Sequence, residues 1–125
     1  MIQSLYIGLG AAVGANLRYF ISLWAAQRFG STLPYGTLIV NISGSLLLGF
    51  LLTLFVERLS LSTEVKLMLA VGFLGSYTTF STFAVESYNL WQASLPWLAL
   101  LNLLGHNLLG LLAVIIGIHL GHLLS

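Results

Sequence analysis

Four long apolar stretches run through this chain, and they decide what it can fold into. They cover residues 5–24, 37–56, 67–91 and 97–124. A helix needs roughly 20 residues to cross a bilayer core about 30 Å thick, so each stretch is long enough to span a membrane. The pattern predicts an all-α membrane protein with four transmembrane helices.

Charged side chains are scarce throughout the chain. Lys and Arg number 4 and Asp and Glu 3, together 6% of the 125 residues, whereas a soluble domain carries about 25%. So few charges cannot cover the water-facing surface of a soluble domain, and the high hydrophobic content excludes disorder. The net charge of +1 indicates no nucleic-acid partner. The absence of cysteine excludes disulfides, thiol catalysis and cysteine-ligated metals.

The connections between the stretches are short and polar. Residues 59–66 are expected to form a loop in which residues 62–64 (STE) suit a helix N-cap, and residues 92–96 a tight turn. No linker or internal repeat interrupts the chain, so residues 1–125 are expected to form a single four-span transmembrane domain. With four crossings, both termini lie on one side of the membrane.

The charges at the span edges barely bias the orientation of the chain. One side carries the N-terminal amine, Arg58 and Lys66, and the other carries Arg28. Because the Lys and Arg balance sets orientation, so weak a bias lets the chain insert either way up. Dual topology of this kind allows an antiparallel dimer.

Glycine pairs four residues apart occur in the first and last stretches. They are Gly10 with Gly14, and Gly117 with Gly121. Small residues at this spacing allow helices to approach closely in lipid, so we expect these faces to pack against other helices.

The third stretch carries an unusual segment at residues 75–83 (GSYTTFSTF), in which all but the two phenylalanines are Gly or bear a hydroxyl. Such a segment forms a poor helix, so we expect the third helix to break near the bilayer midplane. Broken backbone at this depth lines a cavity or is buried in protein. Unwound carbonyls bind cations and helix N-termini favour anions. The alternative is a kinked helix whose hydroxyls bond back to its carbonyls.

Several polar or aromatic side chains inside the stretches are candidates for function. Arg18 and Glu86 are ionisable groups within spans, which mark function unless they pair or bond backbone ends. Asn41 offers an uncharged donor, for a ligand or for another helix. Phe80 and Phe83 share a helix face, where ring edges favour an anion and ring faces a cation, unless they only pack.

The sequence gives little support to an enzyme. The chain contains no Asp, no P-loop and no cofactor fingerprint, and His106 has no evident acid–base partner. His119 and His122 have helical i, i+3 spacing, but no carboxylate accompanies them in the sequence, so we do not expect a metal site there.

Three motifs connect the chain to a known family. They are residues 14–18 (GANLR), 36–41 (GTLIVN) and 72–86 (GFLGSYTTFSTFAVE). In these motifs, and in length and span order, the whole chain resembles the Fluc-type (CrcB) bacterial fluoride channels. The resemblance implies a channel in the bacterial inner (plasma) membrane that passively exports fluoride. It implies an antiparallel dual-topology homodimer with two fluoride pores.

The resemblance also assigns roles to individual residues. It implies that Asn41 donates hydrogen bonds to fluoride and that Phe80 and Phe83 present ring edges to it. Ser81 and Thr82 lie in the same motif and add hydroxyl donors. Neutral donors suit conduction, because a fixed full charge would trap a small, strongly hydrated anion.

A structural sodium ion is the cofactor that the resemblance implies. It lies at the dimer centre and is held by the backbone carbonyls of Gly75 and Thr78 from both subunits. Arg18 and Glu86 match positions near the pore mouths or in structural pairing.

The fourth stretch departs from the family pattern. Gly110 and Val114 replace a Ser and a Thr that continue a polar track in some members. Asn107 or Ser81 could compensate, permeation could be slower, or each subunit of a heterodimer with a paralogue could complete part of a site.

Two other functions remain open. A small four-span cation or multidrug transporter needs a carboxylate early in the chain, and the first stretch contains none. A non-transporting membrane subunit would show no ion flux.

Overall fold

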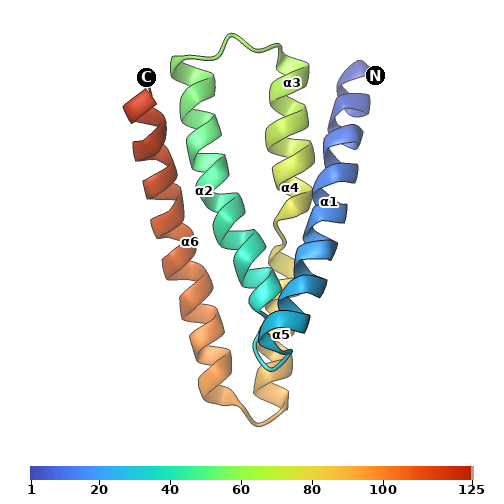
Figure 1. Cartoon of the computed structure of the whole chain (residues 1–125), viewed down its shortest axis with the longest axis vertical. Coiled ribbons are helices and arrows are strands. Elements are labelled where there is room, and N and C mark those ends of the chain that lie inside the picture. Colours follow the sequence, from blue (N-terminus) through green and yellow to red (C-terminus); the bar gives the residue numbers. More distant parts are fainter. Residues whose placement is uncertain (125) are drawn as a thin grey trace.

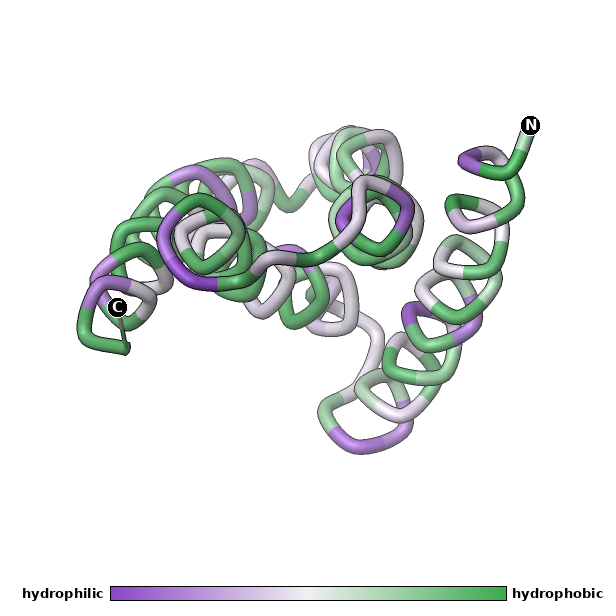
Figure 2. Tube along the Cα trace, turned by 90° about the horizontal axis from the view of Figure 1, so that it is seen from above, coloured by the Kyte–Doolittle hydropathy of each residue, from purple (hydrophilic) through white to green (hydrophobic). Residues whose placement is uncertain are grey.

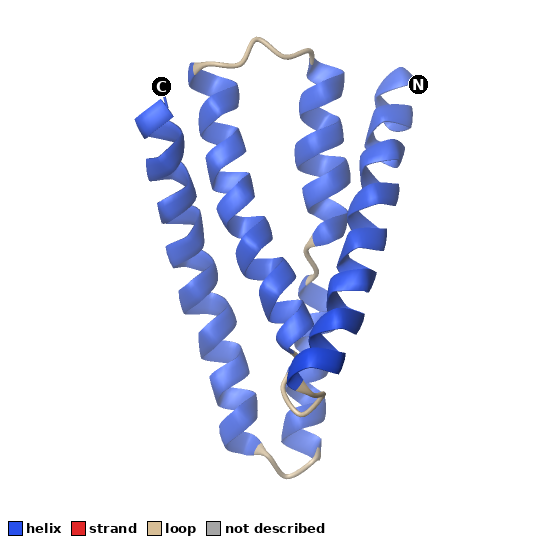
Figure 3. Ribbon diagram, viewed as in Figure 1, coloured by secondary structure: helices blue, strands red, loops and turns tan. Residues whose placement is uncertain are grey.

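The computed structural model describes residues 1–124, and within that range it contains helices and no strands (Figure 3). Ser125, the last residue of the expected domain, lies outside the described residues. The helices are α1 (Ile2–Phe29), α2 (Tyr35–Glu57), α3 (Thr63–Leu67), the π-helix η1 (Met68–Leu74), α4 (Gly75–Tyr77), α5 (Phe80–Gln92) and α6 (Pro96–Leu124).

The helices form four antiparallel segments, with α3 to α5 together making the third. Figure 1 shows both termini and the α2–α3 loop at one end of the molecule, and the other two connections at the opposite end. The placement of both termini at one end agrees with the prediction from four crossings.

Three segments are long and apolar enough to cross a membrane, namely Tyr35–Glu57, Thr63–Gln92 and Pro96–Leu124. Helix α1 has 28 residues but is not among them, and Asn16 and Arg18 in its middle lower its hydropathy. Many large apolar side chains of the helices are exposed, and hydrophobic residues, green in Figure 2, recur along every helix. These features identify a multi-pass membrane protein.

Close backbone contacts hold the segments together, with α1 against η1 and α2 against α6. A Cβ added at Gly10 or Gly14 would collide with carbonyl oxygens of η1, and one at Gly117 would collide with the Leu46 carbonyl. A Cβ at Gly121 would meet a side chain of α2. The prediction that both glycine pairs lie at helix contacts is confirmed.

The predicted N-cap and turn are both present. Ser62 Oγ accepts a hydrogen bond from the Val65 amide at 3.3 Å, and α3 begins at once at Thr63. The loop is therefore shorter than residues 59–66, because the cap starts the helix inside it. The chain reverses at residues 93–95, where Ser94 adopts a φ of 60°.

The third segment is broken, as predicted. Helix α4 ends at Tyr77, Thr78 and Thr79 are extended with φ of −88° and −153°, and α5 begins at Phe80. The alternative of a continuous, kinked helix is wrong. The π-helix η1 before the break was not expected from the sequence, because its apolar residues would suit an ordinary α-helix equally well.

Candidate functional site at the helix break

Asn41 of α2 holds the backbone at the break. Its Oδ1 accepts a hydrogen bond from the Thr79 amide at 2.8 Å, and its Nδ2 donates to the Thr79 carbonyl at 3.0 Å. An amide nitrogen has two N–H groups, so this pairing leaves one of them for another acceptor. Asn41 is thus both a helix-to-helix link and a donor at the break.

Thr79 caps the start of α5. Its hydroxyl accepts from the Thr82 amide at 3.3 Å and donates to Thr82 Oγ1 at 3.0 Å. The first turn of α5 contains no acidic residue. A 13-residue helix that starts here carries partial positive charge at its N-terminus, which favours an anion.

The break also releases two carbonyl groups from the helical ladder. In a continuous helix the Thr79 amide would bond the Gly75 carbonyl, and the Thr82 amide would bond the Thr78 carbonyl. Instead these amides donate to Asn41 and to the Thr79 hydroxyl. Carbonyl oxygens are ligands that hard cations prefer, so Gly75 and Thr78 fit the sodium ion that the resemblance implies.

Arg18 ties α1 to the same break. Its Nε donates to the Ser76 carbonyl at 2.9 Å, at the C-terminal end of α4 where a cation is favourable. Glu86 lies elsewhere and accepts from Thr37 Oγ1 at 2.6 Å. The structure therefore does not pair Arg18 with Glu86.

The two phenylalanines of the motif are in contact. The rings of Phe80 and Phe83 meet edge to face, with centroids 5.7 Å apart and planes at 77°. Phe83 is buried and stacks on His106 at 4.2 Å, whereas Phe80 is 79% exposed in the single chain. The prediction that these residues share a face is confirmed, and their surroundings differ.

A pocket of about 310 Å³ lies at the break. It brings together five of the predicted site residues with four further polar residues: Asn41, Gly75, Thr78, Phe80 and Phe83, with Ser45, Thr79, His106 and Asn107. Among residues 1–124, no Asp, Glu, Lys or Arg lines it, and its lining combines polar side chains, the two phenylalanines and apolar side chains.

A second, larger pocket of about 670 Å³ lies beside the loop at residues 30–34. Thr37, Thr82 and Glu86 line this pocket and not the one at the break. Glu86 Oε2 is buried and has no hydrogen-bond partner among residues 1–124. Ser81 is exposed on α5 and lines neither pocket, so the site residues divide between two places.

Helix α6 contains both positions at which the family's hydroxyls are missing. A Cβ at Gly110 would lie 4.0 Å from Ser45 Oγ, and Val114 packs its backbone against Gly49 of α2. Asn107 lines the pocket at the break, and Ser81 does not. Asn107 also donates to the Leu103 carbonyl of its own helix at 2.8 Å.

Most of the chain is similar to one protein family. The model described as "CrcB-like protein, Camphor Resistance (CrcB)" matches residues 5–118. The chain belongs to the CrcB family. The break, its released carbonyls and the Asn41 link are therefore features of a CrcB member.

Similar CrcB relatives carry one printed name, "Fluoride-specific ion channel FluC". The protein from Chloroflexus aurantiacus is 56% identical over 97% of this chain and 96% of its own length. Those from a Synechococcus strain and from Clostridium perfringens are 47% and 40% identical, over 94% and 99% of this chain and 90% and 97% of their own lengths.

Three residues at these pockets carry a weaker signal in the sequence. Ser45 lies one helical turn beyond Asn41 and donates to its carbonyl at 2.7 Å, and a four-residue spacing on α2 could have found it. His106 stood out as a polar residue in an apolar span, without an assigned role. Thr37 lies in the motif at residues 36–41 without an assigned role, and its bond to Glu86 identifies it.

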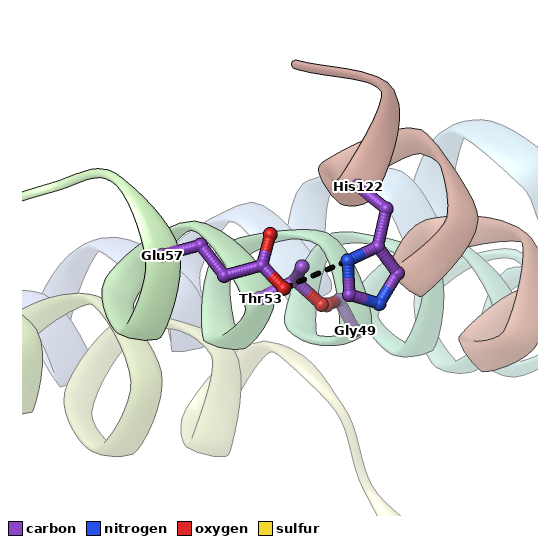
Figure 4. A network of polar contacts seen from close by, with 4 residues as sticks. All are labelled: Gly49, Thr53, Glu57 and His122. Atoms are coloured by element: carbon purple, nitrogen blue, oxygen red, sulfur yellow. Dashed lines mark hydrogen bonds and ion pairs between the residues drawn. The ribbon is translucent and has the colours of Figure 1, made fainter. Parts of the chain in front are cut away.

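The structure corrects one premise about the histidines near the C-terminus, namely that no carboxylate accompanies them. His122 Nδ1 lies 2.8 Å from Glu57 Oε1, so a carboxylate does accompany it (Figure 4). Glu57 comes from the end of α2, and only the fold brings it to α6. His119 bonds the Ile115 carbonyl, and residues 1–124 contain no group of three or more metal-ligating side chains.

Proposed function

We propose that this CrcB member is a fluoride-specific ion channel of the cell membrane, which conducts fluoride passively and is not an enzyme. The observation that carries the proposal is the uncharged pocket at the break, lined by Asn41, Phe80 and Phe83. Relatives at 40–56% identity share the printed name of a fluoride-specific channel, which supports the same activity here.

The chemistry of the pocket suits fluoride. Fluoride holds its water strongly, so a pathway must replace that water with several close donors. The second N–H of Asn41 and the first turn of α5 supply donors, and the edges of aromatic rings carry partial positive charge. Since no full charge lines the pocket, an anion can leave as well as enter.

The pathway also includes the larger pocket. Thr82 and Glu86 line it, and we assign it to one mouth of the pore. Ser81 precedes Thr82 and is exposed in the single chain. A partner helix that covers Ser81 would enclose its hydroxyl, which could then donate to an anion. We assign Arg18 a structural role, in which its side chain donates to the Ser76 carbonyl and links α1 to the break.

We propose that the working unit is an antiparallel dimer with α1 as the fourth span of each subunit. Phe80 at 79% exposure and the exposed Gly75 leave the site open on one side in the single chain. A second copy in the opposite orientation would cover both, and the weak charge bias permits that orientation. Two such sites give two pores, and a paralogue in place of the second copy is the alternative.

A sodium ion at the centre of this dimer is part of the proposal. The Gly75 and Thr78 carbonyls of both subunits would hold it, since both are released from the helical ladder. When bound, the ion would raise the local positive potential without standing in the anion pathway.

Fluoride efflux tests the proposed function. Liposomes loaded with fluoride and containing the purified protein should release it on addition of a potassium ionophore, as followed with a fluoride electrode. A non-transporting subunit predicts no release above protein-free liposomes, and that result would overturn the proposal.

A further inference from the structure

A buried hydrogen bond links α5 to α6 away from both pockets of the pathway. Asn102 Nδ2 donates to Ser87 Oγ at 2.9 Å, and Ser87 Oγ donates to the Phe83 carbonyl at 2.8 Å. Both side chains are 6% exposed, and neither lines the pocket at the break or the larger pocket. Nothing in the pathway described above uses them.

The same two helices meet a second time through aromatic stacking. The rings of Phe83 and His106 lie 4.2 Å apart with planes at 21°. His106 Nδ1 lies 3.1 Å from the Asn102 carbonyl, which can only accept, so Nδ1 carries the proton. The bond to Asn102 and the stack on Phe83 both hold the ring.

These contacts close a circuit of four residues. Ser87 bonds the Phe83 carbonyl, and Asn102 bonds Ser87. The Asn102 carbonyl bonds His106, whose ring stacks on Phe83. The Asn102–Ser87 bond sets the register of α5 against α6, and the stack depends on that register. The imidazole covers one face of Phe83, and the edge of an aromatic ring is the part that attracts an anion.

We propose that Ser87 and Asn102 are positioning residues, which hold Phe83 edge-on to the anion pathway by fixing α5 against α6. They do not touch the anion. The inference rests on the proposed fluoride conduction, and it adds two residues that lie outside the conducting motif.

Removing the bond tests the inference. Interhelical hydrogen bonds in membranes are modest, so Asn102→Leu should lower fluoride efflux per assembled protein by about threefold to tenfold. The matched control is Asn16→Leu, because Asn16 is exposed and bonds only the Ala12 carbonyl of its own helix. The control should stay within about twofold of the unaltered protein.

Two further variants separate positioning from stability. The swapped pair Ser87→Asn with Asn102→Ser restores the bond from the opposite side and should recover efflux, whereas Asn102→Ser alone should not. In the Asn102→Leu background, Phe83→Ile should cause little additional loss, because the ring is already displaced.

Three results would overturn the inference. The first is unchanged efflux in Asn102→Leu, and the second is no recovery in the swapped pair. The third is a double variant of Asn102→Leu and Phe83→Ile whose loss of efflux equals the product of the two single losses. If Asn102→Leu does not assemble, the comparison of Asn102→Ser with the swapped pair decides the question. No efflux from the unaltered protein would instead count against the proposed function.

Discussion

At the scale of single residues, Asn41 has two roles, one in holding the helix break and one as a donor to an anion. Its amide pairs with both backbone groups of Thr79, which fixes the break, and its remaining N–H is available to an anion. The sequence pointed to Asn41 as a donor within an apolar span. It could not show the pairing with Thr79, because the two residues are far apart in the chain.

Replacing Asn41 tests its role as a donor. Asn41→Asp keeps an acceptor for the Thr79 amide, loses the donors and adds a negative charge. Because hydrogen bonds to charged groups are worth about 1.5–3 kcal/mol, fluoride efflux should fall by about tenfold or more. Efflux close to that of the unaltered protein would show that Asn41 does not donate to the anion.

Phe80 allows a test in which folding and conduction separate. Its ring is 79% exposed in the single chain, so Phe80→Ile should leave the fold of each subunit intact while it removes an aromatic edge from the pathway. We expect fluoride efflux to fall sharply, while the elution volume of the protein in size-exclusion chromatography stays unchanged. Phe20→Ile, at a ring 61% exposed on α1, is the matched control, and an equal loss in both variants would contradict the assignment.

At the scale of elements, the broken third segment was the most predictable feature. Glycine and hydroxyl-bearing residues at 75–83 compete with helical hydrogen bonds, and the structure breaks at Thr78 and Thr79. The π-helix before the break, and the Glu57–His122 contact, were not predictable. Both depend on how neighbouring helices pack rather than on local sequence.

Glycine substitutions test the packing of α1 on η1. Gly10→Ala should destabilise the protein by about 1–3 kcal/mol, because the added methyl group collides with backbone of η1. Gly8 has no atom within 4 Å of an added Cβ, so Gly8→Ala should be neutral or stabilising. Thermal unfolding in detergent measures both, and an equal effect at the two positions would contradict the packing.

At the scale of the whole molecule, the scarcity of charge links topology to function. Charges at the helix ends give a weak orientation bias, and the pocket at the break contains no Asp, Glu, Lys or Arg. The family and the membrane location followed from the sequence. The relative placement of the two pockets did not, because it depends on the angles between helices.

The proposed sodium ion belongs to this scale, since two subunits would share it. A high-resolution structure of the dimer should show density between the Gly75 and Thr78 carbonyls of both subunits. Metal–oxygen contacts there should be shorter than hydrogen bonds to water, which centre on about 2.7–2.8 Å. Contacts of hydrogen-bond length would mark a water molecule and contradict the proposal.

Parallel release of fluoride and chloride tests the central claim most directly. Liposomes that contain the purified protein and equal concentrations of both anions should empty their fluoride and retain their chloride, as followed with two ion-selective electrodes. This result is expected because small neutral donors can replace the water around fluoride in a narrow pathway. Retention of both anions, or release of both at equal rates, would contradict the account.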